Sequence, residues 1–426
     1  MAANQTLISV EKLTVGMYVD IQLGWAHHPF LFRKLKIKSA HEIQIMKDLG
    51  LKEVMLFPEK SDKESLEASK KIDDTSEFEE ETNATSSDEL WQQKQEALKK
   101  ADNFRINRKK IALQYREKQK RVKNLTADLK TAPANAIRDA GEVVNDMLEN
   151  FNEDSDVLIN LVSLSSDDHS HHCHTLNVAV LSLTIGNALG LSKQELKLLG
   201  MGAILHDIGK VAIPAAIINK KGKKTTSEIK LLQTHTTAGA RIAEAMPEVD
   251  QRVIHVIKHH HELLDGSGFP NGLKGDDIST ICRIVAIANI YDNLCNNPDP
   301  AAALIPKSAM AILFKKYQNK LDIDLVQHFI KTFGVYPPGT VVKLNDESIA
   351  LVISVDPSTI LKPKVLLYNP DIPANQALLL NLAEHEKLEV VSVLKPNECP
   401  PRVYEYLGIQ ENMGFYLETI KKQSGS

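Results

Sequence analysis

The sequence lacks the features that mark a secreted, membrane-spanning or nucleic-acid-binding protein. Its four cysteines are scattered and form no CxxC pair, so neither a disulfide framework nor a zinc ribbon is indicated, and a reduced, cytoplasmic location fits. The first residues, MAANQTLISVEKL, have no basic region followed by an apolar stretch, so no signal peptide is expected. No run of about 18 apolar residues occurs, so no membrane span is expected. The formal net charge of -4 gives no basic excess for nucleic acid.

Histidine, by contrast, is abundant and clustered. The chain has 15 histidines, and most of them fall between His169 and His261. Imidazole is a common ligand of first-row divalent metals, so the clustering indicates a metal site in the middle of the chain.

Composition and periodicity divide the chain into five segments. The N-terminal segment has turn and strand character around the helical stretch SAHEIQIMKDL, and the C-terminal segment has short apolar runs separated by Pro, Gly, Asn and Asp. Between them, an acidic, polar stretch predicts a mobile linker. We expect a small α+β domain (1–58), an acidic flexible linker (59–90), a basic helical stalk (91–135), a helical domain (136–333) and a small β-rich region (334–426).

The two helical segments differ in pattern. The stalk is rich in helix formers and strongly basic from Arg105 to Lys123. It fits a solvated helix face, a signalling stalk that could form a homodimer, or, since aromatic residues are sparse beside it, less well a nucleic-acid contact. In the helical domain, apolar residues recur at intervals of three and four. The helix after His174 is apolar on more than one face, which predicts that it is buried.

Side chains suited to a divalent metal recur through the helical domain. In chain order they are His174, His206, Asp207, His235, His260, His261, Asn289 and Asp292. An adjacent His and Asp can act together, because the imidazole binds one ion while the two carboxylate oxygens bridge to a second. Two such ions activate water and polarise a phosphodiester at neutral pH. Lys210 follows Asp207 by three residues, so its ammonium could reach a phosphate oxygen in the same cavity.

The motifs that carry these residues resemble those of a known family. HDIGKVAIP, THTTAG, HHHELLDGSGFPNGLKG and RIVAIANIYDNL are similar, in order and spacing, to the HD-GYP family of bacterial phosphodiesterases over about residues 136–330. The first 130 residues look like a small domain of unknown function that often precedes this module. The resemblance implies a mainly α fold built on an HD-type helical bundle. It also implies a site with two or three iron or manganese ions, and hydrolysis of cyclic di-GMP to the linear dinucleotide or GMP.

The resemblance assigns roles residue by residue. Asp207 and Lys210 match the catalytic aspartate and the phosphate-contacting lysine, and Gly268, Phe269 and Pro270 match the motif at the lip of the site. The metal ligands implied are His174, His206, Asp207, His235, His260 and His261, with Asn289 at the position of a further ligand.

Four departures separate this chain from the family pattern. Asn289 stands where the family has an aspartate, so one negative charge is lost and affinity for one ion should fall, unless Asp292 compensates one turn later. The stretch NNPDPAA carries no cation where the family has two that hold phosphates. Phe269 replaces a tyrosine and loses only a hydroxyl. Ser170 replaces a carboxylate that some three-metal members have, so we expect two ions at most.

Other polar residues near these motifs have more than one interpretation. DDHSHHCH before His174 fits a polar loop better than a metal cluster. Glu262 could orient a histidine or lie exposed at a helix end. Asp265 could stabilise a turn, and Arg283 could pair with a carboxylate or reach a phosphate.

Three functions therefore remain open from the sequence. The first is an active cyclic di-GMP phosphodiesterase with two divalent ions, iron or manganese. The second is a non-catalytic module that binds nucleotide or a partner, such as a cyclic di-GMP synthase, since Asn289 and the missing cations weaken the site. The third is a metal phosphohydrolase for another substrate.

Overall fold

The computed structural model describes residues 6–70, 87–128, 131–164, 171–220, 222–297, 302–385, 387–394 and 398–408. The chain forms two compact units, one of residues 1–103 and 369–378 and the other of residues 104–368 and 379–426. No helix in the described ranges is long and apolar enough to cross a membrane. The four cysteines, all described, are free thiols.

The first unit contains a four-stranded antiparallel sheet in the order β1-β4-β2-β3. The strands are β1 (Thr6–Ser9), β2 (Tyr18–Asp20), β3 (Lys34–Lys36) and β4 (Glu53–Leu56). Helix α1 (Ala40–Asp48) begins after Ser39, whose side chain accepts a hydrogen bond from the Glu42 amide and so caps the first turn. Ile43, Ile45 and Met46 of α1 are buried in the core of this unit, so the predicted α+β character is confirmed.

The predicted linker is shorter than its composition suggested. Helix α2 (Lys63–Ser69) lies inside the stretch 59–90 that we expected to be a mobile linker. The Asp62 amide donates to the Gly16 carbonyl, Ser65 is buried, and Leu66 packs on the core of the first unit. Residues up to Ser69 therefore fold with the N-terminal sheet, because a few well-placed side chains anchor a polar segment. The part of the predicted linker at 71–86 lies outside the described residues.

Helix α3 (Ser87–Asp128) is the predicted basic stalk, and it contributes residues to both units. In the first unit, Lys94 is buried and donates to the carbonyls of Trp25 and His28. In the second unit, Tyr115 and Val122 belong to the helical core. The helix is therefore not solvated on all faces, because Tyr115, Val122 and two of its lysines, Lys94 and Lys118, are buried. Pairing of two stalks stays a prediction.

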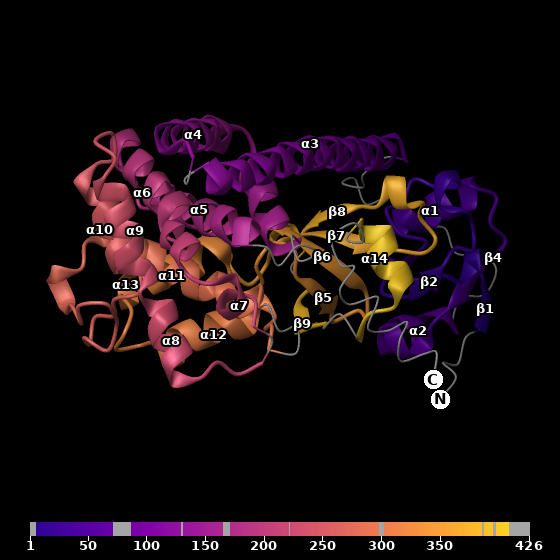
Figure 1. Cartoon of the computed structure of the whole chain (residues 1–426). Coiled ribbons are helices and arrows are strands. Elements are labelled where there is room, and N and C mark those ends of the chain that lie inside the picture. Colours follow the sequence, from indigo (N-terminus) through magenta and orange to yellow (C-terminus); the bar gives the residue numbers. More distant parts are fainter. Residues whose placement is uncertain are drawn as a thin grey trace, which may run out of the picture. The chain divides into compact units, whose positions relative to one another are not determined.

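The second unit is a bundle of helices around α5. Its helices are α4 (Pro133–Leu164), α5 (His171–Ala188), α6 (Lys193–Leu205), α7 (Ala215–Ile218), α8 (Thr226–Gln233), α9 (His235–Glu244), α10 (Gln251–His259), α11 (Thr280–Cys295), α12 (Pro306–Lys316) and α13 (Ile323–Phe333). Helix α5 packs against α4, α6, α11 and α13 (Figure 1). Val178, Leu181 and Ile185 on one line and Leu176 and Leu183 on another are all buried, so the prediction of a buried central helix is confirmed.

A five-stranded antiparallel sheet follows the helices, in the order β8-β7-β6-β5-β9. The strands are β5 (Val341–Leu344), β6 (Ile349–Ser354), β7 (Lys364–Tyr368), β8 (Leu379–Asn381) and β9 (Val390–Val393). The short helix α14 (Pro401–Leu407) packs on β7. This sheet confirms the β-rich C-terminal region, and the chain as a whole is mainly α with a sheet near each end. Apart from the linker, the domain boundaries drawn from the sequence stay a prediction.

Candidate metal centre

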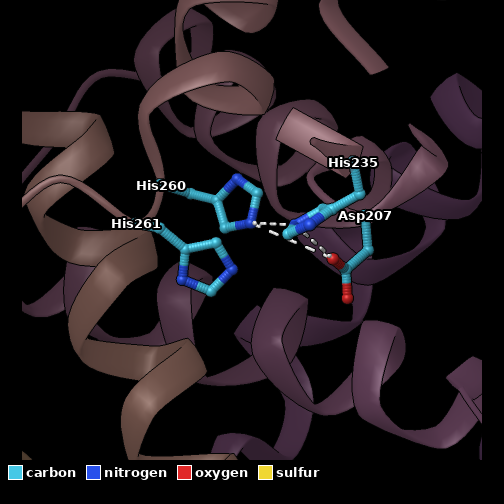
Figure 2. A group of neighbouring side chains, drawn as sticks. All are labelled: Asp207, His235, His260 and His261. Carbon is cyan, nitrogen blue, oxygen red and sulfur yellow. Dashed lines mark hydrogen bonds and ion pairs between the residues drawn. The ribbon is translucent and has the colours of Figure 1, made fainter. Parts of the chain in front are cut away.

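Histidines from four segments of the second unit converge on one carboxylate. Two groups of side chains have ligand atoms within 4.8 Å of one another, and Asp207 belongs to both. The first group is His174, His206 and Asp207, and the second is Asp207, His235, His260 and His261. Figure 2 shows the second group, with the three imidazoles and the carboxylate facing a common centre. Of the metal-ligand residues expected from the sequence, six are thus brought together.

Local backbone features bring Asp207 and His235 close. Helix α6 ends at Leu205, and the chain continues through His206 and Asp207 into a single 3-10 turn, Ile208–Ala212. Gly209 of this turn lies against the start of α9, where an added Cβ would come within 1.8 Å of the His235 carbonyl oxygen. Only glycine permits this approach of two backbones. The glycine of HDIGK is therefore required for packing, because it lets the turn contact the backbone of α9 closely.

The two carboxylate oxygens of Asp207 face different histidines. Oδ2 lies 3.2 Å from His206 Nε2 and 3.7 Å from His174 Nε2. Oδ1 lies 3.2 Å from His235 Nε2 and 3.9 Å from His260 Nε2. A carboxylate with one oxygen toward each group has the arrangement needed to bridge two ions.

Hydrogen bonds at the other ring nitrogen orient these histidines. Nδ1 of His206, His235 and His260 each lies 2.6–2.9 Å from the carbonyl oxygen three residues earlier, and His174 Nδ1 lies 2.6 Å from Asp292 Oδ2. Since each Nδ1–H donates to an oxygen, each Nε2 carries a lone pair directed at the centre. His235 Nε2 and His260 Nε2 are only 3.3 Å apart. Lone pairs packed this closely around a carboxylate suit a cation, so the residues fit a divalent metal.

The protonation states also suit metal binding. Burial lowers the pKa of His206, and it lowers the pKa of His260 and of His261 well below the usual value, with neighbouring imidazoles adding to the effect on these two. Burial alone would raise the pKa of Asp207, but the Lys210 ammonium and His206 outweigh it and hold this pKa well below its usual range. These shifts favour neutral imidazoles at His206, His260 and His261 and an ionised carboxylate at Asp207, which are the forms that bind metal.

Lys210 lies where its position in the sequence predicted. Its Nζ is 2.5 Å from Asp207 Oδ2, and its side chain is 23% exposed whereas that of Asp207 is 4% exposed. The ammonium therefore stands between the buried carboxylate and the surface of the domain. A group in this position can neutralise Asp207 and also receive an anionic ligand from outside.

Helix α11 contributes a buried amide and a buried carboxylate. Asn289 Oδ1 accepts a hydrogen bond of 2.7 Å from Asn293 Nδ2. Asp292 accepts hydrogen bonds from Asn177 and Asn296 at Oδ1, and its Oδ2 is bonded to His174 Nδ1. Asp292 therefore orients a histidine, and the idea that it replaces the lost carboxylate at 289 as a ligand is not supported. Sequence reasoning missed this role, although the spacing of one turn from Asn289 pointed to the same helix face.

The loop after His261 is held by Glu262 and Gly268. Glu262 is buried and accepts from the amides of Asn271 at 2.7 Å and Leu273 at 3.1 Å. It therefore neither orients a histidine nor lies exposed, and both earlier interpretations were wrong. An added Cβ at Gly268 would come within 2.4 Å of the Leu263 amide nitrogen, so the loop requires glycine there.

Phe269 packs directly on a predicted ligand. Its ring stacks on His261, with centroids 4.5 Å apart and an interplanar angle of 22°. Pro270 follows through a cis peptide bond and is exposed. An aromatic ring at 269 is sufficient for the stack, which explains why the loss of the tyrosine hydroxyl leaves the contact intact.

Two further residues have structural partners. Asp265 accepts from the Ser267 amide at 2.9 Å, which is the turn-stabilising role. Arg283 pairs with Asp322 and Asp276, which is the structural pairing. The predicted features at His169, Ser170, Pro298 and Ala301 lie outside the described residues.

Comparison with known proteins matches two family models to this chain. The HD-domain family model matches residues 156–325, which include every residue of both histidine groups. This match and the relatives described next are consistent with the HD-GYP family that the motifs resemble. A second family model, described as a domain of unknown function, matches residues 5–140, ahead of the HD-domain match.

Curated relatives match this chain over different lengths. It is 27% identical over 370 residues to a cyclic di-GMP phosphodiesterase of Pseudomonas aeruginosa, which covers 85% of this chain and 84% of the relative. It is 36% identical over 148 residues to a cyclic di-GMP phosphodiesterase response regulator of Xanthomonas campestris, of which it spans 39%. A solved HDG"Y"P protein of Bdellovibrio bacteriovorus is 18% identical, with a TM-score of 0.44, over 76% of this chain and 98% of that one.

Proposed function

We propose that this protein is a metal-dependent phosphodiesterase that hydrolyses cyclic di-GMP to the linear dinucleotide or GMP in bacterial second-messenger signalling. The observation that carries the proposal is the position of Asp207, whose two oxygens each face a separate group of histidines. The relatives from Pseudomonas and Xanthomonas are named cyclic di-GMP phosphodiesterases, which supports the choice of substrate.

Two divalent ions, iron or manganese, would occupy the centre. His174, His206 and Asp207 would hold one, and Asp207, His235, His260 and His261 the other. Asn289 would be a weak oxygen donor to the first. Bound there, divalent ions supply Lewis-acid polarisation of the phosphodiester and an activated water. Asp207 would keep both groups in register, and the neutral imidazoles would leave the centre without competing protons.

Lys210 and the Gly268-Phe269-Pro270 loop would act on the substrate. The Lys210 ammonium, partly exposed above Asp207, is placed to attract a phosphate oxygen to the centre. The loop carries Phe269 against His261 and leaves Pro270 exposed, so it would form part of the wall that the substrate contacts. Asp207 and Lys210 are the residues that we assign to catalysis.

Two alternatives rest on specific observations. Relatives in Vibrio cholerae are named 3'3'-cGAMP-specific phosphodiesterases, one of them 34% identical over 197 residues, so a different cyclic dinucleotide is the first alternative. The second is a degenerate module that binds nucleotide or a partner such as a cyclic di-GMP synthase, because an amide stands at Asn289. We also propose that the protein acts in the cytoplasm, because its four cysteines are free thiols, as is usual in a reducing compartment.

One preparation tests these possibilities together. Metal content and hydrolysis of cyclic di-GMP and 3'3'-cGAMP would be measured on the full chain, purified anaerobically with iron or manganese. About two ions per chain and linear product from cyclic di-GMP are expected. Product from 3'3'-cGAMP alone would change the substrate, and one ion or none without product, but with nucleotide binding, would identify the degenerate module.

A further inference from the structure

A chain of buried hydrogen bonds leads from helix α3 to a histidine of the metal centre. The Tyr115 hydroxyl of α3 donates to Asn177 Oδ1 on α5. Asn177 Nδ2 donates to Asp292 Oδ1 on α11 over 2.9 Å, and Asp292 Oδ2 is 2.6 Å from His174 Nδ1. Four side chains from three helices therefore form one continuous path that ends at an imidazole.

Each bond in this path fixes the orientation of the next group. An amide side chain can present either its oxygen or its nitrogen to a neighbour, and the Tyr115 hydroxyl is satisfied by the oxygen of Asn177. The nitrogen of Asn177 is thereby turned toward Asp292. The carboxylate, with one oxygen occupied by amides, presents the other to His174 Nδ1. His174 Nε2 then faces Asp207.

Burial makes the path costly to break. Tyr115 is 4% exposed, and Asn177 and Asp292 are each 1% exposed. Removal of one partner leaves a polar atom without water to replace it, so the remaining groups must reorient. The path is therefore a rigid connection rather than a set of interchangeable surface contacts.

Helix α3 contacts the first turns of α5 at two adjacent places. One helical turn after Tyr115, Gln119 Nε2 lies 3.0 Å from Sγ of Cys173, the residue before His174. Tyr115 and Gln119 of α3 thus bracket His174, through Asn177 on one side and Cys173 on the other. A change at this face of α3 would act directly on the turn of α5 that carries the histidine.

Building on the function proposed above, we propose that Tyr115 is a positioning residue for the metal centre. Through Asn177 and Asp292 it holds His174 in the orientation that binds the ion shared with His206 and Asp207. The ion held by His235, His260 and His261 does not depend on it. Because α3 also contributes residues to the N-terminal unit, this path gives that helix control over one of the two ions.

The test is a metal titration of full-length Tyr115→Phe, a change that removes the hydroxyl and keeps the buried ring. Co²⁺ absorption and isothermal calorimetry would follow binding to the metal-free protein. We expect the first equivalent to bind as in the parent and the second to bind about 10-fold more weakly, with an altered Co²⁺ spectrum. Tyr404→Phe, which removes a hydroxyl from another buried tyrosine of the same unit, is the matched control.

A double-mutant cycle separates positioning from simple destabilisation. If Tyr115 acts through Asn177, Tyr115→Phe should cause no further loss of the second ion in an Asn177→Ala background. Normal binding of both ions by Tyr115→Phe, equal weakening of both ions, or additive losses in the cycle would each overturn the proposal.

The outcome for the proposed function is read separately. A parent protein that binds two ions without hydrolysing a cyclic dinucleotide would refute the enzyme and leave the positioning role to be decided by the titration. A parent that binds no ion would refute both.

Discussion

Asp292 Oδ2 and His174 Nδ1 lie 2.6 Å apart although the two residues are separated by 118 positions in the sequence. The Asp292 carboxylate thus orients the imidazole ring of His174 and is not itself placed as a metal ligand. Replacement by Asp292→Leu should leave His174 free to rotate and weaken the ion that His174 shares with His206 by about 10- to 100-fold. Calorimetric titration with Mn²⁺ measures this change, and an unaltered affinity would show that the hydrogen bond has no role in binding.

Asn289→Asp should strengthen metal binding. The substitution adds a negative charge and a better oxygen donor on the helix that carries Asp292, so affinity for the weaker ion should rise about 10-fold or more. Metal content after dialysis against a weak chelator, compared with the parent, checks this. Asn187→Asp, at an exposed position of α5, is the control for added charge alone, and an equal rise in both variants would contradict a ligand at 289.

Asp207→Ala should abolish both metal binding and turnover. Asp207 is the only residue shared by the two groups of metal-ligand candidates identified among the described residues. Its loss should therefore empty both positions and reduce hydrolysis at least 1,000-fold, about the contribution of two ions that stabilise a transition state. Inductively coupled plasma spectrometry and circular dichroism would be run on the same sample. Retention of one full equivalent of metal would argue against a bridging role.

Gly209→Ala should misplace Asp207 relative to His235. The added methyl group would collide with the His235 carbonyl oxygen and with the Gly239 amide, both of them backbone atoms that cannot move aside cheaply. We expect destabilisation of about 3 kcal/mol and loss of metal binding. Gly141→Ala is the matched control, because no atom lies within 4 Å of its added Cβ, and it should gain up to about 1 kcal/mol by helix propensity. Urea unfolding followed by circular dichroism compares the two.

Acidification should destabilise the N-terminal unit through His28. Burial, aided by the Lys94 charge, lowers the pKa of His28 to about 4, whereas an unfolded histidine titrates near 6.5. Below pH 6.5, His28 is therefore protonated in the unfolded chain but stays neutral in the folded chain. The unfolding free energy falls as the pH drops through this range. Between pH 7.5 and pH 5 the loss should be about 2 kcal/mol.

Tryptophan fluorescence measures this effect selectively. The chain has two tryptophans, Trp25 and Trp91, and both belong to the first unit. His28→Leu should remove most of the pH dependence of the fluorescence-detected unfolding, and the exposed His27→Asn should retain it. The same pH dependence in all three proteins would mean that other groups control acid unfolding.

The sequence was sufficient to identify the elements that depend on local pattern. Val178, Leu181 and Ile185 repeat at helical intervals and have apolar neighbours. A helix that is apolar on more than one face is buried in the protein interior. The motif around His206 and Asp207 predicted metal binding, because adjacent imidazole and carboxylate groups suit divalent ions. Average composition did not predict the polar helix α2. This helix is attached to the N-terminal unit by a few residues, among them Leu66 and Ser65.

Tertiary structure alone decided which partner each polar group has. By sequence Asp292 was a possible ligand and Glu262 a possible support for a histidine, but packing of α11 on α5 gives Asp292 to His174, and the loop amides of Asn271 and Leu273 take up Glu262. The sequence by itself therefore determined the helices, the ligand types and the resemblance to a family. Only the tertiary structure determined which histidine each oxygen of Asp207 faces and the path from Tyr115, because a contact between distant residues depends on distances that no local pattern encodes.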